Sequence, residues 1–185
     1  KMTTDNKDNK LSIESSDYAE ILRHAVAVIE HARTEIARHV NGYVSTAYWE
    51  IGQMLHERKI ESGYGDSVVK RLSADLKERY PKMGVSPRNL WYMKKFYERY
   101  AGHNEKVQRS VALLPWSHNM LLLSKGLDDD ATLYYATKTV EKGWNRDLLL
   151  NAIKLNMYET QALARVDNNF DRTLPAEQAQ YANEV

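Results

Sequence analysis

Two polar residues at the start of one predicted helix, Arg88 and Asn89, have side chains that proteins often use to recognise bases in DNA. Arginine bonds guanine and asparagine bonds adenine through paired hydrogen bonds, each worth about 1–3 kcal/mol of discrimination. They follow Ser86-Pro87, a pair typical of a helix N-terminus. In a helix-turn-helix, the first turn of the second helix reaches the bases. These residues therefore predict base or phosphate contacts, with a capping network at the helix start as the alternative.

Positive charge is concentrated in the same part of the chain. Residues 67–100 contain nine lysines and arginines against three acids, a net charge of +6, whereas the whole chain carries +1 and the remainder therefore −5. Such a local field favours a polyanionic partner. We expect salt-dependent phosphate contacts from Lys82, Lys94, Lys95 and Arg99, and a phosphate hydrogen bond or stacking from Tyr92. The alternatives are a solvated helix face for the bases and packing at the core edge for Tyr92.

Other residues that could take part in catalysis or metal binding are better explained by structural roles. His118 is predicted to be a structural hydrogen-bonding residue. Glu50, among bulky apolar residues, predicts a buried salt bridge rather than acid–base catalysis. The acids at 128–130 are typical of a helix N-terminus, where they complement the helix dipole. The histidines have no metal-ligand spacing and no nucleophile lies beside a base, so we expect no cofactor and no catalytic residue in this chain.

The bulk composition limits the class of protein. The 185 residues include no cysteine, which excludes disulfides and favours a reducing, cytoplasmic location. No apolar run approaches the roughly 20 residues needed to cross a bilayer, so we expect no membrane partner. The N-terminal segment lacks the apolar core of a signal peptide. We expect residues 1–15 to form a disordered polar tail.

Long periodic segments, separated by only eight glycines and four prolines, predict an all-α fold. The first helix should begin near Ser16 or Asp17 and continue to about Arg58, although Asn41-Gly42 is an alternative end. A helix of about 40 residues is hard to bury within one small domain. We therefore expect this long N-terminal helix to pair with a second subunit in a homodimer.

Two shorter helices follow and have the frame of a helix-turn-helix. The first should start at Asp66 or Ser67 and bury four apolar residues, Val68, Val69, Leu72 and Leu76. The turn covers residues 81–85, with Gly84 in a left-handed conformation. The second helix runs from Pro87 to about Tyr100, with an apolar stripe of Leu90, Met93, Phe96 and Tyr97.

The remaining segments predict further helices. Residues 101–111 are expected to be a polar connector. A short helix should follow from His118 to Lys125, capped by Ser117. Another should start at residues 128–130 and end near Gly143, and the last should run from Arg146 to about residue 163.

Several motifs, taken together and in order, resemble the N-terminal domain of the YhcG family. The motifs are Tyr48-Trp49-Glu50-Ile51-Gly52, Gly63-Tyr64-Gly65, Leu72-Ser73-Ala74-Asp75-Leu76, Val85-Ser86-Pro87-Arg88-Asn89-Leu90, Met93 with Phe96-Tyr97, Leu114-Pro115-Trp116-Ser117-His118, Tyr134-Tyr135, and Gly143-Trp144-Asn145-Arg146. The resemblance covers about residues 29–174. It implies one helical domain over residues 16–165.

The resemblance also carries expectations about function. Similar proteins continue into a C-terminal PD-(D/E)xK nuclease domain, where an Asp and a Glu-x-Lys surround a divalent metal. We expect residues 166–185 to be a linker toward such a domain, and the metal and catalytic residues to belong to it. The full-length protein would then be a metal-dependent nuclease.

The resemblance implies that this half of the protein binds duplex or branched DNA and delivers it to the nuclease. The alternative is a protein-interaction or dimerisation module without nucleic-acid binding. That alternative is favoured if the basic residues pair with Glu57, Glu61 or Glu98. Catalysis by this chain alone is a third and weaker reading.

Overall fold

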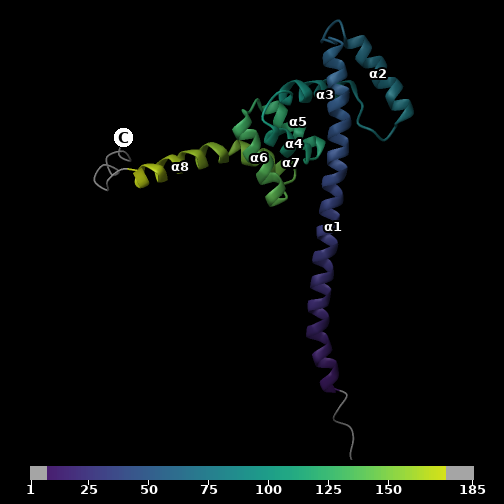
Figure 1. Cartoon of the computed structure of the whole chain (residues 1–185). Helices are drawn as coiled ribbons and strands as arrows, with labels where there is room; N and C mark the ends of the chain where they lie inside the picture. Colours follow the sequence, from purple (N-terminus) through teal and green to yellow (C-terminus); the bar gives the residue numbers. More distant parts are fainter. Residues whose placement is uncertain (1–7, 174–185) are drawn as a thin grey trace, which may run out of the picture. The chain divides into compact units, whose positions relative to one another are not determined.

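A computed structural model describes the backbone of residues 8–173 and the side chains of residues 22–166, apart from Ala25. Within this described backbone there are eight α-helices and no strand, which confirms the all-α prediction. The helices are α1 (Asp8–Glu57), α2 (Asp66–Arg79), α3 (Pro87–Tyr100), α4 (Glu105–Ala112), α5 (Trp116–Lys125), α6 (Asp129–Lys142), α7 (Arg146–Lys154) and α8 (Met157–Thr173) (Figure 1). None of the described helices is long and apolar enough to span a bilayer.

The chain divides into two units, residues 1–40 and 41–185, and α1 contributes to both. α1 is one helix of 50 residues that continues through Gly42, which confirms the prediction of a long N-terminal helix. A start near Ser16 is wrong, since α1 begins at Asp8 and residues 8–15 contain no glycine or proline to interrupt it. Parts of the predicted tail and of the predicted linker, residues 1–7 and 174–185, lie outside the described residues.

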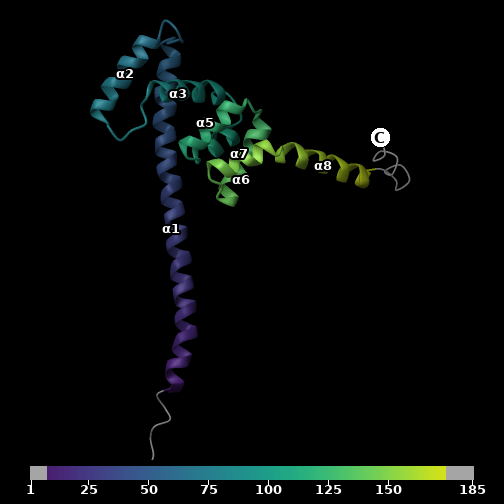
Figure 2. The ribbon, with the colours of Figure 1, turned by 180° about the vertical axis from the view of Figure 1, so that it is seen from behind.

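The second part of α1 packs against α2 and α3 in a smaller hydrophobic cluster. Its buried members are Tyr48, Leu55, Val69, Leu90 and Met93. α2 lies beside the end of α1 in both views of the ribbon (Figures 1 and 2). Gly52 allows the backbones of α1 and α3 to touch, because a Cβ at Gly52 would collide with the Met93 carbonyl group.

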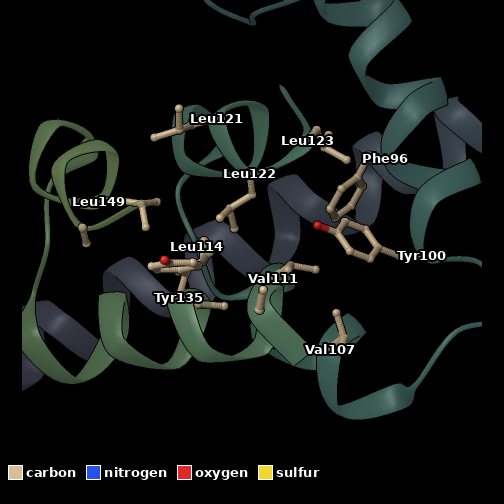
Figure 3. Packing of buried hydrophobic residues seen from close by; sticks show 13 residues of the cluster. Phe96, Tyr100, Val107, Val111, Leu114, Leu121, Leu122, Leu123, Tyr135 and Leu149 are labelled. Carbon is tan, nitrogen blue, oxygen red and sulfur yellow. The ribbon is translucent and has the colours of Figure 1, made fainter. Parts of the chain in front are cut away.

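The larger hydrophobic cluster is built by α3 to α7 together with Leu114, which lies between α4 and α5. Its labelled members in Figure 3 are Phe96, Tyr100, Val107, Val111, Leu114, Leu121, Leu122, Leu123, Tyr135 and Leu149. Leu90 and Met93 of α3 belong to the smaller cluster, whereas Phe96 and Tyr100 belong to the larger one. α3 therefore takes part in both clusters.

The prediction of a polar connector over residues 101–111 is wrong, because α4 lies there. Asn104 caps this helix by accepting a hydrogen bond from the Lys106 backbone N–H at 2.9 Å. Val107 and Val111, four residues apart on one face, are both fully buried. Both valines belong to the larger cluster, so α4 is packed against it.

Smaller differences concern helix ends and one side chain. The single helix expected after Arg146 is interrupted between α7 and α8 by Asn156, which has a left-handed φ of 50°. α5 begins at Trp116, with Pro115 rather than Ser117 as its N-cap. Gly84 is not left-handed. Val68 is exposed, so that prediction of burial is also wrong.

Candidate nucleic-acid interface

α3 covers Pro87–Tyr100, as predicted, and a local network holds its start. The Ser86 hydroxyl accepts a hydrogen bond from the Asn89 backbone N–H at 3.2 Å. The Asn89 side-chain Nδ2 donates to the Gly84 carbonyl oxygen, also at 3.2 Å. A Cβ at Gly84 would lie 3.0 Å from this Nδ2 and disturb the contact. The geometry thus gives Asn89 the alternative role in a capping network, with its amide nitrogen engaged inside the turn.

Lys94 is buried and ion-paired. Its Nζ lies 2.9 Å from Glu61 Oε1 and 3.2 Å from Glu98 Oε1, with 7% of its side chain exposed. Burial alone lowers the pKa of Lys94, but the hydrogen bonds to the two carboxylates outweigh it and raise the pKa above its ordinary value. The Lys94 charge is therefore neutralised within the protein. We exclude Lys94 from the candidate nucleic-acid interface.

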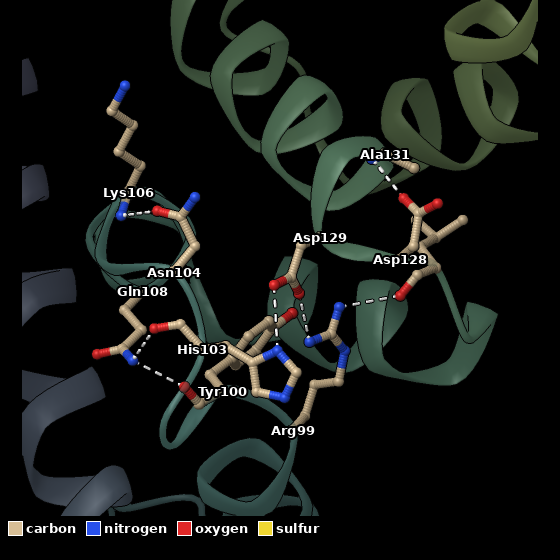
Figure 4. A network of polar contacts seen from close by, with 10 residues as sticks. Arg99, Tyr100, His103, Asn104, Lys106, Gln108, Asp128, Asp129 and Ala131 are labelled. Atoms are coloured by element: carbon tan, nitrogen blue, oxygen red, sulfur yellow. Dashed lines mark hydrogen bonds and ion pairs between the residues drawn. The ribbon is translucent and has the colours of Figure 1, made fainter.

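Arg99 is also engaged by partners in the protein (Figure 4). Its Nη1 lies 2.7 Å from Asp129 Oδ1, and its Nη2 donates to the Leu127 carbonyl oxygen at 3.0 Å. His103 Nδ1 lies 3.1 Å from the second oxygen of Asp129. The Arg99 hydrogen bond is the main cause that lowers the pKa of Asp129, opposed by burial and reinforced by His103. These contacts connect the end of α3 to the start of α6.

The remaining predicted residues of α3 form one row on the surface, which we call the α3 stripe: Arg88, Tyr92 and Lys95. Their spacing of four and three residues places them on one helix face. Arg88 and Lys95 are exposed, and neither has an ion pair within the described side chains. Tyr92 is half-buried against the larger cluster, which agrees with its alternative role at the core edge. The stripe and Trp91 line an open cavity of about 320 Å³.

More exposed bases precede the stripe. Lys82 lies in the connection between α2 and α3, and α2 itself presents Lys70, Arg71, Lys77 and Arg79. Among the described residues none of these five has a salt bridge. The connection covers seven residues, 80–86, and is longer than the three or four of a typical helix-turn-helix. The helix-turn-helix stays a prediction.

The structure also shows the surroundings of three other residues that the sequence analysis singled out. His118 is buried and its Nε2 lies 2.8 Å from the Trp144 carbonyl oxygen, in line with a structural role. Asp128 accepts a hydrogen bond from the Ala131 backbone N–H at 2.8 Å and caps α6, as expected for this acidic run. Glu50 is exposed, so the predicted buried salt bridge is wrong. Glu50 lines an open cavity together with Trp49, Phe96 and Arg109.

Sequence reasoning missed Trp91 as a member of this site and Asp129 as the partner of Arg99. Trp91 lies three residues after Arg88 and four before Lys95, so helical spacing alone would have placed it beside the stripe. Asp129 had no such signal, because it lies 30 residues from Arg99 along the chain. The described side chains contain no group of three or more His, Asp or Glu residues that would hold a metal ion.

Comparison with known proteins identifies the family. Residues 24–160 match the family described as DUF1016 N-terminal domain. "Putative nuclease YhcG" of Escherichia coli (strain K12) is 28% identical in an alignment of length 182 that covers 81% of this chain and 48% of that protein. The chain thus spans about half the length of this curated relative. No solved structure matches the chain significantly. The match over most of the chain confirms the resemblance to the YhcG family, and the chain belongs to the family of DUF1016 N-terminal domains.

Proposed function

We propose that this chain is a DNA-binding, non-catalytic domain of a nuclease-family protein, and that it delivers DNA to a catalytic domain elsewhere in the full-length protein. The name of the relative, a nuclease, supports the association with nucleases. The chain aligns with only about half of that relative, which leaves room for a catalytic domain outside the matched half.

The α3 stripe is the observation that carries the proposal. It presents Arg88 and Lys95 on one exposed face, both without an ion pair among the described side chains. Exposed bases of α2 and Lys82 extend the positive charge beyond the stripe. Unpaired cations of this kind bind phosphates and release counterions. The proposal is phosphate recognition rather than base reading, because Asn89, Lys94 and Arg99 have partners within the protein.

The test is the binding of labelled duplex and branched DNA between about 50 and 200 mM salt. We expect affinity that falls steeply with salt, and a marked loss in the double variant Arg88→Ala/Lys95→Ala. The matched control is Lys125→Ala/Lys142→Ala, which removes two exposed charges from the ends of α5 and α6. Absence of binding at low salt, or equal losses in both double variants, contradicts the proposal.

A second candidate function, self-association through α1, is favoured by a separate observation. Leu22, Ile29 and Ile36 recur every seven residues and are 50%, 57% and 63% exposed. Val26 and Val40 follow four residues after Leu22 and Ile36 and are also exposed. Seven-residue apolar spacing is typical of helices that pair as coiled coils. The pairing of Lys94 with Glu61 and Glu98 also favours this interaction module, because it withdraws one base from nucleic-acid binding.

Light scattering tests self-association. We expect a homodimer mass for the chain and a monomer mass for Ile29→Glu/Ile36→Glu. The control, Ala27→Glu/Thr34→Glu, places the same charges on the opposite face of α1 and should remain dimeric. A monomer mass for the unaltered chain would rule out this candidate without affecting the DNA-binding proposal.

A further inference from the structure

Two neighbouring aromatic side chains, Trp91 and Tyr92, line the open cavity beside the α3 stripe. Part of each ring packs inward, Tyr92 against the larger cluster and Trp91 against the smaller one. Both remain partly exposed on the cavity side. The cavity volume of about 320 Å³ is at the small end of the range for ligand sites and suits a single planar group.

Two cations flank these rings. Arg88 Cζ lies 5.7 Å and Lys95 Nζ lies 5.9 Å from the centroid of the Tyr92 ring. They stand four residues before and three residues after Tyr92, so one lies toward each end of the helix. A third cation, Lys94, lies 6.0 Å from the Trp91 centroid, but its charge is neutralised by Glu61 and Glu98. The site therefore has an aromatic floor between two free positive charges.

This combination fits one unit of an unpaired nucleic-acid strand better than a duplex. An unpaired base exposes its flat face, which stacks on aromatic side chains while cations hold the phosphates on either side. In a duplex the base faces are stacked on each other, and only base edges and the backbone are accessible. Asn89, one of the two residues predicted to read base edges, is engaged in the capping network.

We infer that the cavity binds an unpaired nucleotide, with its base stacked on Trp91 and Tyr92 and its neighbouring phosphates held by Arg88 and Lys95. The inference rests on the proposed DNA-binding function and narrows it to single-stranded segments. Such segments occur in branched DNA and at the ends of duplexes. The site has no requirement for a particular base, because every base has a flat aromatic face.

The experiment compares three labelled probes of equal length, about 16 nucleotides, by fluorescence anisotropy at low salt. The probes are oligo-deoxythymidine, an abasic strand with the same phosphates, and a duplex. We expect oligo-deoxythymidine to bind about tenfold more tightly than the abasic strand. Equal binding of these two strands, or tighter binding of the duplex, overturns the inference but leaves the DNA-binding function standing. Absence of binding to every probe overturns both.

Variants locate the effect at the two rings. Tyr92→Leu and Trp91→Leu should each reduce the preference for oligo-deoxythymidine over the abasic strand, whereas Tyr92→Phe, which keeps the ring, should retain it. Tyr64→Leu is the control, since Tyr64 is 91% exposed in the loop between α1 and α2. The preference is a ratio measured on one protein preparation, so a partly unfolded variant lowers both affinities and leaves the ratio intact.

Two outcomes of the ring variants would contradict base stacking. If Tyr92→Leu and Trp91→Leu both keep the full preference, the rings do not stack with a base. If Tyr92→Phe loses as much as Tyr92→Leu, the hydroxyl group rather than the ring makes the contact. The first outcome overturns stacking at this site, and the second overturns stacking on Tyr92.

Discussion

The Arg99 guanidinium lies 2.7 Å from Asp129 Oδ1, so an ion pair joins the last turn of α3 to the first turn of α6. The two side chains come from positions 30 residues apart in the sequence. Both are partly shielded from solvent, with 24% and 30% of the side chains exposed. This pair fixes the end of the helix that carries the α3 stripe.

Asp129→Asn is expected to lower the free energy of unfolding by about 1 kcal/mol at neutral pH, as judged for a partly exposed charged hydrogen bond. Urea unfolding measures the change. The control is Asp147→Asn, because Asp147 is exposed and its one ion-pair contact, with Arg146, is as long as 3.9 Å. A loss in the control as large as that in Asp129→Asn would show that the network in Figure 4 does not stabilise the fold.

The contribution of Asp129 should depend on pH. The pKa of Asp129 is lowered from its ordinary 3.8, first by the Arg99 hydrogen bond. A folded-state pKa below the unfolded one gives stability that is complete above the unfolded value and lost as the pH falls through the folded value. The difference in unfolding free energy between the unaltered chain and Asp129→Asn should therefore persist at about pH 5 and shrink below about pH 4. A difference that grows in acid would contradict this sign.

Two glycines of α1 should respond to alanine in opposite directions. Gly52→Ala inserts a methyl group against the Met93 carbonyl and should cost about 1–3 kcal/mol or more in unfolding free energy. Gly42→Ala meets no atom within 4 Å and should raise stability by about 0.5–1 kcal/mol, since alanine favours a helix interior. Thermal and urea unfolding of both variants measures the pair. A Gly52→Ala variant as stable as the unaltered chain would refute the close backbone contact.

Asn89→Ala distinguishes capping from base recognition. Loss of the hydrogen bond to the Gly84 carbonyl should lower the free energy of unfolding by about 1 kcal/mol. The DNA affinity of the folded protein should remain unchanged, because the interface does not include this side chain. A selective loss of affinity for adenine-containing sites, with stability intact, would restore the base-reading role.

Two adjacent lysines should differ in the salt dependence of DNA binding. Lys95→Gln should reduce the slope of log affinity against log salt by about one, because an exposed phosphate contact is removed. Lys94→Gln should leave this slope unchanged and instead lower stability, because Glu61 and Glu98 lose their shared counter-ion. A slope for Lys95→Gln equal to that of the unaltered chain would mean that Lys95 does not contact a phosphate.

The helix that carries the candidate site was predictable because its signals are local. Ser86 and Pro87 mark its start, and the spacing of Leu90, Met93 and Phe96 predicts its buried face. The same local logic failed for α4, where two valines within a polar segment gave too weak a periodicity. It failed again at Asn156, since one left-handed residue interrupts a pattern that continues on both sides.

The roles of the individual bases were less predictable, because their partners are distant in the sequence. Lys94 and Lys95 are adjacent and chemically identical, yet one is buried between carboxylates and the other is exposed. Glu61 and Lys94 are 33 residues apart, and nothing local in the sequence indicates that the two will pair. Charge counting in the sequence therefore found the basic region but could not separate free cations from paired ones.

α3 lies between two hydrophobic clusters and contributes to each. Neither cluster can lose this helix and keep its own packing, so the two clusters depend on each other for stability. A ligand that binds the exposed face of α3 would add its binding free energy to both clusters at once. The surface proposed to bind an unpaired strand thus belongs to the helix that both clusters share.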